Sequence, residues 1–406
     1  MKASSESQSF AFFETVWDSN CCVMGKTWDL ACYATVQGKA WLPWLCETLR
    51  VTPRFWGKCG CHGSVRSCVL RRGSGESVAV VPRFSCWRAR LANCRRPVSL
   101  PNRPYTPKPI TVKTSSRCFN SSPSPPPKPL FIVFPDNQGK YEVILFFPGT
   151  SVSNTSYSKL FDHLASHGYI VVSPQLYNLM PPKGNKEVDA AAEEINWLPK
   201  GLQSHLPENV VADLNYSALM GHSRGGLTAF ALAQGYATNP PLGLKFSALV
   251  GVDPVAGIPY FHSELDPPIL DYESFNFSIP VTVIGTGLGG LAKCVVPCAP
   301  EKENHQQFFN RCTSSDRAHF DATYYGHMDV LDDCPPDLKS LAISKCMCTN
   351  GTLPRQPMRQ CVSGIAVAFL KAYFDSEGDD FKTILADPSV APITLGQVEF
   401  IPAPSS

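Results

Sequence analysis

The stretch "SALMGHSRGGLTAFALA", from Ser217 to Ala233, decides the fold. It opens with a short apolar run typical of a buried strand, and from Leu227 onward it has the Ala/Leu/Phe composition of a helix. The turn between them matches G-x-S-x-G, the pattern of a nucleophile elbow at a strand–turn–helix junction. The alternative interpretation is a glycine-rich structural joint that happens to contain a serine. The turn consists of Gly221, His222, Ser223, Arg224, Gly225 and Gly226.

Apolar runs alternate with helical segments from Leu130 to the end of the chain. The runs are rich in Val, Ile, Leu and Phe, as in strands buried on both faces of a parallel sheet. This alternation predicts an α/β fold with a doubly wound, mostly parallel sheet, whose site lies at the carboxyl ends of the strands. The predicted strands are 130–134, 142–149, 169–175, 216–221, 246–253 and 279–285, and the helices include 156–168, 186–198 and 363–374.

Two polar residues follow later strands and could activate Ser223. Asp253 comes directly after the run "LVGV", and the next predicted strand is followed by "TGLGG", which contains no acid. His327, in "YYGHMDV", is the last of the nine histidines and follows a β-branched and aromatic stretch. A serine hydroxyl needs a base and an orienting acid, and Ser…Asp…His is the order of α/β-hydrolases. We therefore predict a triad of Ser223, Asp253 and His327, while an Asp-Pro turn remains the alternative for Asp253.

The other histidines near these segments fit a catalytic base less well. His319 precedes the strand-like run, and His305 lies in a helical segment that we expect to face the surface. We expect His222 only to shape the elbow. An oxyanion formed on ester attack needs two N–H donors, which we place at Arg224 and at Thr150, with Ser151 as the alternative to Thr150.

No cofactor, metal or membrane-spanning segment is expected. "GTGLGG", residues 285–290, matches G-x-G-x-x-G, but a Pro/Cys loop follows where a dinucleotide site needs a helix. Cys59-x-Cys61-His62 has no second ligand pair at zinc-finger spacing, so unstructured or reduced thiols are the favoured interpretation. No run of about 18 apolar residues occurs. Disulfides among the seven cysteines after Ser223 are an option that the sequence does not pair.

The N-terminal part of the chain differs in kind from the rest. Residues 1–128 contain 19 Lys and Arg against 6 Asp and Glu, a charge of +13, whereas the remainder carries −11. We divide the chain into an irregular or disordered basic extension (1–110), a Pro/Ser-rich linker that leads to the first strand (111–129) and a catalytic domain (130–406). The extension reads as a disordered leader, a targeting segment or a wrongly predicted exon. A nucleic-acid arm is not expected, because no motif supports it.

Seven segments resemble the chlorophyllase family, the plant esterases that remove phytol from chlorophyll. They are "GHSRGG", "SHGYIVVSPQLY", "NWLPKGLQSHLPENV", "KFSALVGVDPVAG", "IPVTVIGTGLG", "YGHMDVLDD" and "GIAVAFLKAYF", and the resemblance extends from about Thr111 to Phe400. It implies an α/β-hydrolase without cofactor, with Ser223, Asp253 and His327 as its triad and chlorophyllide and phytol as products. Where family members usually carry His-Gly at the oxyanion loop, this chain carries Pro148-Gly149.

The resemblance also implies chlorophyll as the binding partner and the chloroplast as the location, with the cytosol or an endomembrane surface as alternatives. We expect a peripheral contact with a membrane, and the sequence assigns no oligomeric state. Three other functions stay open. One is a different lipophilic-ester hydrolase or lipase on the same fold, and another is an inactive homologue that binds the pigment. The third is a nucleic-acid or membrane-surface role for the basic extension.

Overall fold

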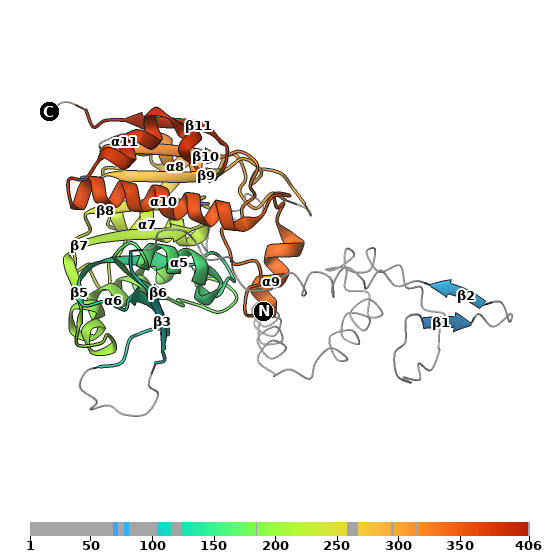
Figure 1. Ribbon diagram of the computed structural model, residues 1–406, viewed down its shortest axis with the longest axis horizontal. Coiled ribbons are helices and arrows are strands. Elements are labelled where there is room, and N and C mark those ends of the chain that lie inside the picture. The colour runs from blue at the N-terminus through green and yellow to red at the C-terminus, as the bar shows by residue number, and fades with distance from the viewer. Residues whose placement is uncertain are drawn as a thin grey trace, which may run out of the picture. The chain divides into compact units, whose positions relative to one another are not determined.

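The protein consists of two compact units, residues 1–93 and 94–406. In the first unit, strands β1 (Cys68–Arg71) and β2 (Ser77–Val80) pair antiparallel, where the sequence predicts no strands. The remainder of what the sequence predicts for residues 1–103, including the Cys59/Cys61 motif, lies outside the described residues. The computed structural model (Figure 1) describes residues 68–71, 77–80, 104–114, 124–183, 185–257, 267–293, 296–313 and 315–404.

A nine-stranded sheet forms the centre of the described part of the second unit, in the order β11-β10-β9-β8-β7-β5-β6-β4-β3. Every neighbouring pair in the run β10-β9-β8-β7-β5-β6 is parallel. At one edge β4 pairs antiparallel with β6 and with β3, and at the other edge β11 pairs antiparallel with β10. The mostly parallel α/β sheet predicted from the sequence is confirmed. The strands are β3 (Pro107–Val112), β4 (Leu130–Pro135), β5 (Gly139–Phe147), β6 (Tyr169–Pro174), β7 (Val210–His222), β8 (Ala248–Val252), β9 (Val281–Thr286), β10 (Arg317–Ala322) and β11 (Leu395–Ile401).

Helices lie on both faces of this sheet (Figure 1). The α-helices among the described residues are α5 (Ser158–Ala165), α6 (Lys186–Gly201), α7 (Arg224–Ala233), α8 (His305–Arg311), α9 (Leu338–Ala342), α10 (Arg355–Phe374) and α11 (Asp379–Ala386). Short 3-10 helices are η1 (Asn154–Tyr157), η2 (Leu202–His205), η3 (Ile269–Asp271) and η5 (Pro388–Val390), and η4 (Ile343–Met347) is a single π-helical segment.

Each face of the sheet has its own hydrophobic core. Side chains alternate along a strand, so in β4 Phe131 and Val133 pack with α5, α10 and α11. Leu130, Ile132 and Phe134 of the same strand pack on the opposite face with α6, α7 and α8. This two-sided burial is the physical reason for the continuous apolar strand runs in the sequence.

The two edge strands were not predicted. β3, "PKPITV", has exposed and intermediate positions and contains Pro107 and Pro109, which an edge strand tolerates because one of its sides forms no ladder. The sequence boundary at residue 110 falls inside this strand. No helix in the described residues is both long and apolar enough to cross a membrane.

Candidate active site

Ser223 sits on a strained turn at the carboxyl end of β7 and at the start of α7. Its backbone has φ 57° and ψ −125°, which costs a non-glycine residue about 1–3 kcal/mol and persists only when the surroundings enforce it. A Cβ added to Gly225 would lie 2.0 Å from the carbonyl oxygen of Phe147 in the neighbouring strand. Only glycine permits this close approach of helix and sheet, so the turn has the tight geometry of an elbow.

The structure brings Ser223, His327 and Asp253 into one hydrogen-bonded chain. Ser223 Oγ lies 2.8 Å from His327 Nε2, and His327 Nδ1 lies 2.7 Å from Asp253 Oδ2. Asp253 directly follows β8, and His327 lies in the loop after β10, so all three occupy the carboxyl ends of parallel strands. A carboxylate only accepts, so Nδ1 of His327 carries the proton and Nε2 is left to accept the serine hydroxyl.

The Asp253 carboxylate is fully buried and held from several sides. Thr286 donates its hydroxyl to Oδ2 at 2.5 Å and its amide to Oδ1 at 3.3 Å. Burial by itself raises the pKa of Asp253, but the hydrogen bond and charge of His327, with smaller contributions from His305 and Thr286, outweigh it and lower the pKa. Asp253 therefore stays ionised and can stabilise a cation on His327. Thr286 ends the next strand, β9, and its local sequence pattern gives no signal that it supports the acid.

A buried ion pair shapes the loop that carries His327. Asp329 accepts hydrogen bonds from the amides of Gly326 and Gly351 through Oδ2, at 2.8 and 2.6 Å. Its Oδ1 accepts from Arg355 Nε at 3.0 Å. Asp329, which lies two residues after His327, thereby links the loop that carries the imidazole to the first turn of α10.

His305 was expected at the surface, and this expectation is wrong. It begins α8 with 8% of its surface exposed, and its Nδ1 lies 2.8 Å from Nε2 of buried His319. Its Nε2 lies 4.0 Å from Asp253 Oδ1. The reason is a close approach to strand β9, because a Cβ on Gly285 would lie only 2.2 Å from His305 Nδ1. His319 is part of β10 rather than preceding a strand, and burial lowers its pKa to about 3.

The segments predicted to supply the oxyanion donors lie beside Ser223. Arg224 is the first residue of α7, where backbone N–H groups have no partner within the helix and favour negative charge. The Gly149 amide donates to Tyr157 Oη at 3.0 Å, which leaves Thr150 as the next amide of this loop. A hydrogen bond from Val152 N to Gly149 O at 3.1 Å closes the turn, with Ser151 at φ 59°.

The Arg224 side chain points away from this chemistry into a buried ion pair. Its Nε donates to Glu187 Oε2 at 2.6 Å, and Thr228 donates to Glu187 Oε1 at 2.9 Å. Burial raises the pKa of Glu187 and the charge of Arg224 opposes this. Glu187 borders a small pocket beside the oxyanion loop, and its charge is already neutralised within the protein, which suits an uncharged ester. The pocket is lined by Pro148, Gly149, Gln175, Leu176, Tyr177 and Glu187.

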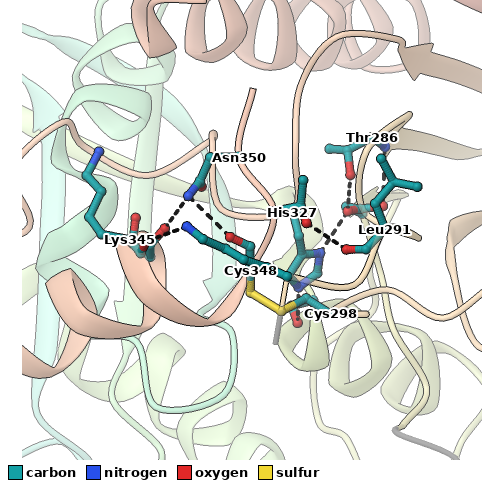
Figure 2. Close-up of a disulfide and its surroundings, with 12 residues drawn as sticks. Thr286, Leu291, Cys298, His327, Lys345, Cys348 and Asn350 are labelled. Carbon is teal, nitrogen blue, oxygen red and sulfur yellow. Dashed lines mark hydrogen bonds and ion pairs between the residues drawn. A yellow bond between two sulfur atoms is a disulfide. The ribbon is translucent and has the colours of Figure 1, made fainter. Parts of the chain in front are cut away.

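A disulfide between Cys298 and Cys348 joins the loop after β9 to the segment after η4. Figure 2 shows it beside His327, with Thr286 and Leu291 nearby. Cys334 is also disulfide-bonded. Some of the late cysteines are thus oxidised, an option that the sequence left open. Cys361, in contrast, is a buried thiol, and burial raises its pKa to about 12.

The sheet order and the strand–turn–helix junction at Ser223 define the class of protein: the chain is an α/β-hydrolase. A strand antiparallel to its neighbours near one edge and helices on both faces agree with this class. The chain belongs to the chlorophyllase family, whose model matches residues 102–402.

Curated relatives support this membership. Chlorophyllase-1, chloroplastic, of Citrus unshiu is 59% identical over 302 residues, which cover 74% of this chain and 88% of that protein. Chlorophyllase-1 of Arabidopsis thaliana is 48% identical over 273 residues, or 66% of this chain and 83% of the relative. Chlorophyllase-2 of Arabidopsis thaliana is 42% identical over 284 residues, or 67% and 86%. The relatives are carboxylic ester hydrolases.

Proposed function

We propose that the chain is a serine esterase that hydrolyses the phytyl ester of chlorophyll to chlorophyllide and phytol, in the chloroplast. The observation that carries the proposal is the buried chain Ser223–His327–Asp253, with 2.8 and 2.7 Å contacts, in a protein of the chlorophyllase family. The chloroplast location follows the Citrus relatives, which are named chloroplastic.

In the first half of the reaction, His327 Nε2 takes the proton of Ser223 as Oγ attacks the propionate ester carbonyl. Asp253 keeps the imidazole oriented and stabilises its cation. The amides of Arg224 and Thr150 hold the oxyanion, and the N-terminus of α7 adds a favourable dipole. His327 then donates its proton to the phytol oxygen, which leaves, and Ser223 carries the acyl group.

In the second half, water replaces phytol. His327 takes a proton from this water as it attacks the acyl carbonyl, and the same two amides hold the second oxyanion. The bond to Ser223 Oγ then breaks, and His327 returns the proton to the serine. Chlorophyllide leaves as a carboxylic acid, which ionises to the carboxylate and releases the second proton of the water to solvent. The original proton of Ser223 has left with phytol, and the first proton of the water replaces it on the serine.

A comparison of substrates tests the proposal against its rivals. We expect a higher kcat/KM for detergent-dispersed chlorophyll than for p-nitrophenyl butyrate, because binding of the large ester contributes to catalysis at the carbonyl. Products would be measured by partition of green pigment between hexane and aqueous acetone. Higher kcat/KM on the short ester would favour a general lipophilic-ester hydrolase. Chlorophyll binding without product would favour an inactive pigment-binding protein.

We also propose that the rim near His327 contacts a lipid membrane. Leu291 and Met347 expose 53% and 55% of their surfaces, and the bridge between Ala292 and Cys348 holds their segments together. The exposed Lys293 beside them would add attraction to anionic lipid. Because chlorophyll carries a long hydrocarbon tail, a membrane contact at this rim would bring the site close to its substrate.

Replacing Leu291 and Met347 together by Asp is expected to weaken binding to phosphatidylglycerol-containing vesicles about tenfold or more. Burial of one such side chain contributes about 2 kcal/mol, and about 1.4 kcal/mol is tenfold. Co-sedimentation measures the change. Val211→Asp, at an exposed position on the amino-terminal part of β7, is the control and should bind like the unaltered chain. Equal binding by the double variant and the control would refute the contact.

A further inference from the structure

We propose that Tyr157 and His222 are positioning residues that hold the oxyanion loop and the base His327 in register with Ser223. The inference rests on the proposed function of Ser223 and His327. It concerns a chain of buried hydrogen bonds that the triad itself does not include, and that starts one residue before the nucleophile.

These hydrogen bonds join three segments of the site. Gly149 N lies 3.0 Å from Tyr157 Oη, and Tyr157 Oη lies 2.8 Å from His222 Nδ1. On the other side of the ring, His222 Nε2 lies 2.8 Å from the carbonyl oxygen of His327. Tyr157 and His222 are fully buried, so water does not compete for these contacts. The oxyanion loop, the elbow and the base loop thus meet at one imidazole.

The direction of each hydrogen bond follows from chemistry. The His327 carbonyl can only accept, so His222 carries its proton on Nε2 and leaves Nδ1 as an acceptor. The Tyr157 hydroxyl must then donate to Nδ1, and its oxygen accepts from the Gly149 amide. Each donor has a single acceptor, and removing the hydroxyl leaves both the amide and Nδ1 unpaired.

The charge state of His222 agrees with this arrangement. Burial, and next the neighbouring charge of His327, lower the pKa of His222 to about 3, while Asp253 opposes the shift. A neutral His222 keeps Nδ1 able to accept from Tyr157. It also spares His327, whose ring centre is 4.8 Å away, from a second positive charge when His327 takes the serine proton.

The hydrogen-bond chain also explains why an imidazole precedes the nucleophile. An aliphatic side chain could fill the space below the elbow, but it could neither donate to the His327 backbone nor accept from Tyr157. Because Gly149 comes directly before Thr150, the Tyr157 hydroxyl sets where the proposed oxyanion amide points. Misplacement of such a group by about 1 Å can cost about 100-fold in rate.

Tyr157→Phe tests the hydrogen-bond chain, because it removes the hydroxyl and keeps the ring. We expect kcat on chlorophyll to fall about 10- to 100-fold with KM unchanged, because geometry for the transition state is lost while substrate binding is not. His222→Leu should lower kcat further. His222→Gln, whose amide nitrogen can still donate to the His327 carbonyl, should restore part of the loss. If the residues act through one chain, Tyr157→Phe combined with His222→Gln should cost less than the product of the two single losses.

Tyr141→Phe is the matched control, because it removes the hydroxyl of another buried tyrosine, which donates to Asn137 O at 3.1 Å near the start of β5. Thermal unfolding of each variant separates misfolding from mispositioning. A kcat for Tyr157→Phe equal to that of Tyr141→Phe overturns the inference, and so do purely multiplicative losses. Ser223→Ala, measured in parallel, distinguishes failure of the two proposals. If Ser223→Ala stays active, the proposed function fails. If Ser223→Ala is inactive while Tyr157→Phe has normal kcat, only the inference about the Tyr157–His222 hydrogen bonds fails.

Discussion

Ser223→Ala is expected to lower kcat on chlorophyll by about 10⁶-fold, the loss that follows when a triad serine is removed. The variant keeps the elbow and the His327–Asp253 pair but has no Oγ at the 2.8 Å position facing Nε2. No acyl-enzyme can form. The residual activity is measured as chlorophyllide and phytol released over several hours and quantified by chromatography.

The matched control for this variant is Ser217→Ala. Ser217 lies in the same strand β7 and is also buried, and its hydroxyl donates to Lys245 O at 3.4 Å, away from the site, so this variant should leave kcat unchanged. A Ser223→Ala protein that retained more than a few per cent of the activity would rule out Ser223 as the nucleophile.

Asp253→Asn has the second-largest expected effect, a fall in kcat of about 10⁴-fold. The amide nitrogen of Asn would donate to His327 Nδ1, which forces the imidazole proton onto Nε2. His327 could then no longer accept the proton of Ser223. Steady-state rates, together with binding of chlorophyll by fluorescence quenching, would show that kcat falls while affinity remains.

Asp213→Asn serves as the control for loss of a buried carboxylate. Asp213 lies near the start of β7 and pairs with Lys140, so its replacement is expected to change stability and not kcat. Should Asp253→Asn lose no more activity than Asp213→Asn, another acid would have to orient His327.

The strands from β4 to β9, and the placement of Ser223, Asp253 and His327 at one edge of the sheet, were predictable because each depends on local sequence. Strands buried on both faces need continuous apolar runs, and the polar residue after each run falls at the carboxyl edge of the sheet. The edge strands escaped prediction because an edge needs neither continuous apolar character nor absence of proline, as β3 shows with Pro107 and Pro109. β10, "RAHFDA", was hidden by its polar and charged residues.

The supporting contacts of the site were not predictable in the same way. Tyr157 meets His222 across 65 residues of sequence, and that contact depends on how η1 lies against β7. The polar neighbours of His305 in "KENHQQFF" predict a surface helix. Its burial depends on the absence of a side chain at Gly285, which only the packed structure reveals.

The most direct test of the account is hydrolysis of chlorophyll by the purified full chain in H₂¹⁸O, with both products analysed by mass spectrometry. Attack of Ser223 on the ester carbonyl, followed by water on the acyl-enzyme, predicts one ¹⁸O in the chlorophyllide carboxylate and none in phytol. Absence of chlorophyllide, or ¹⁸O in phytol, would contradict the account.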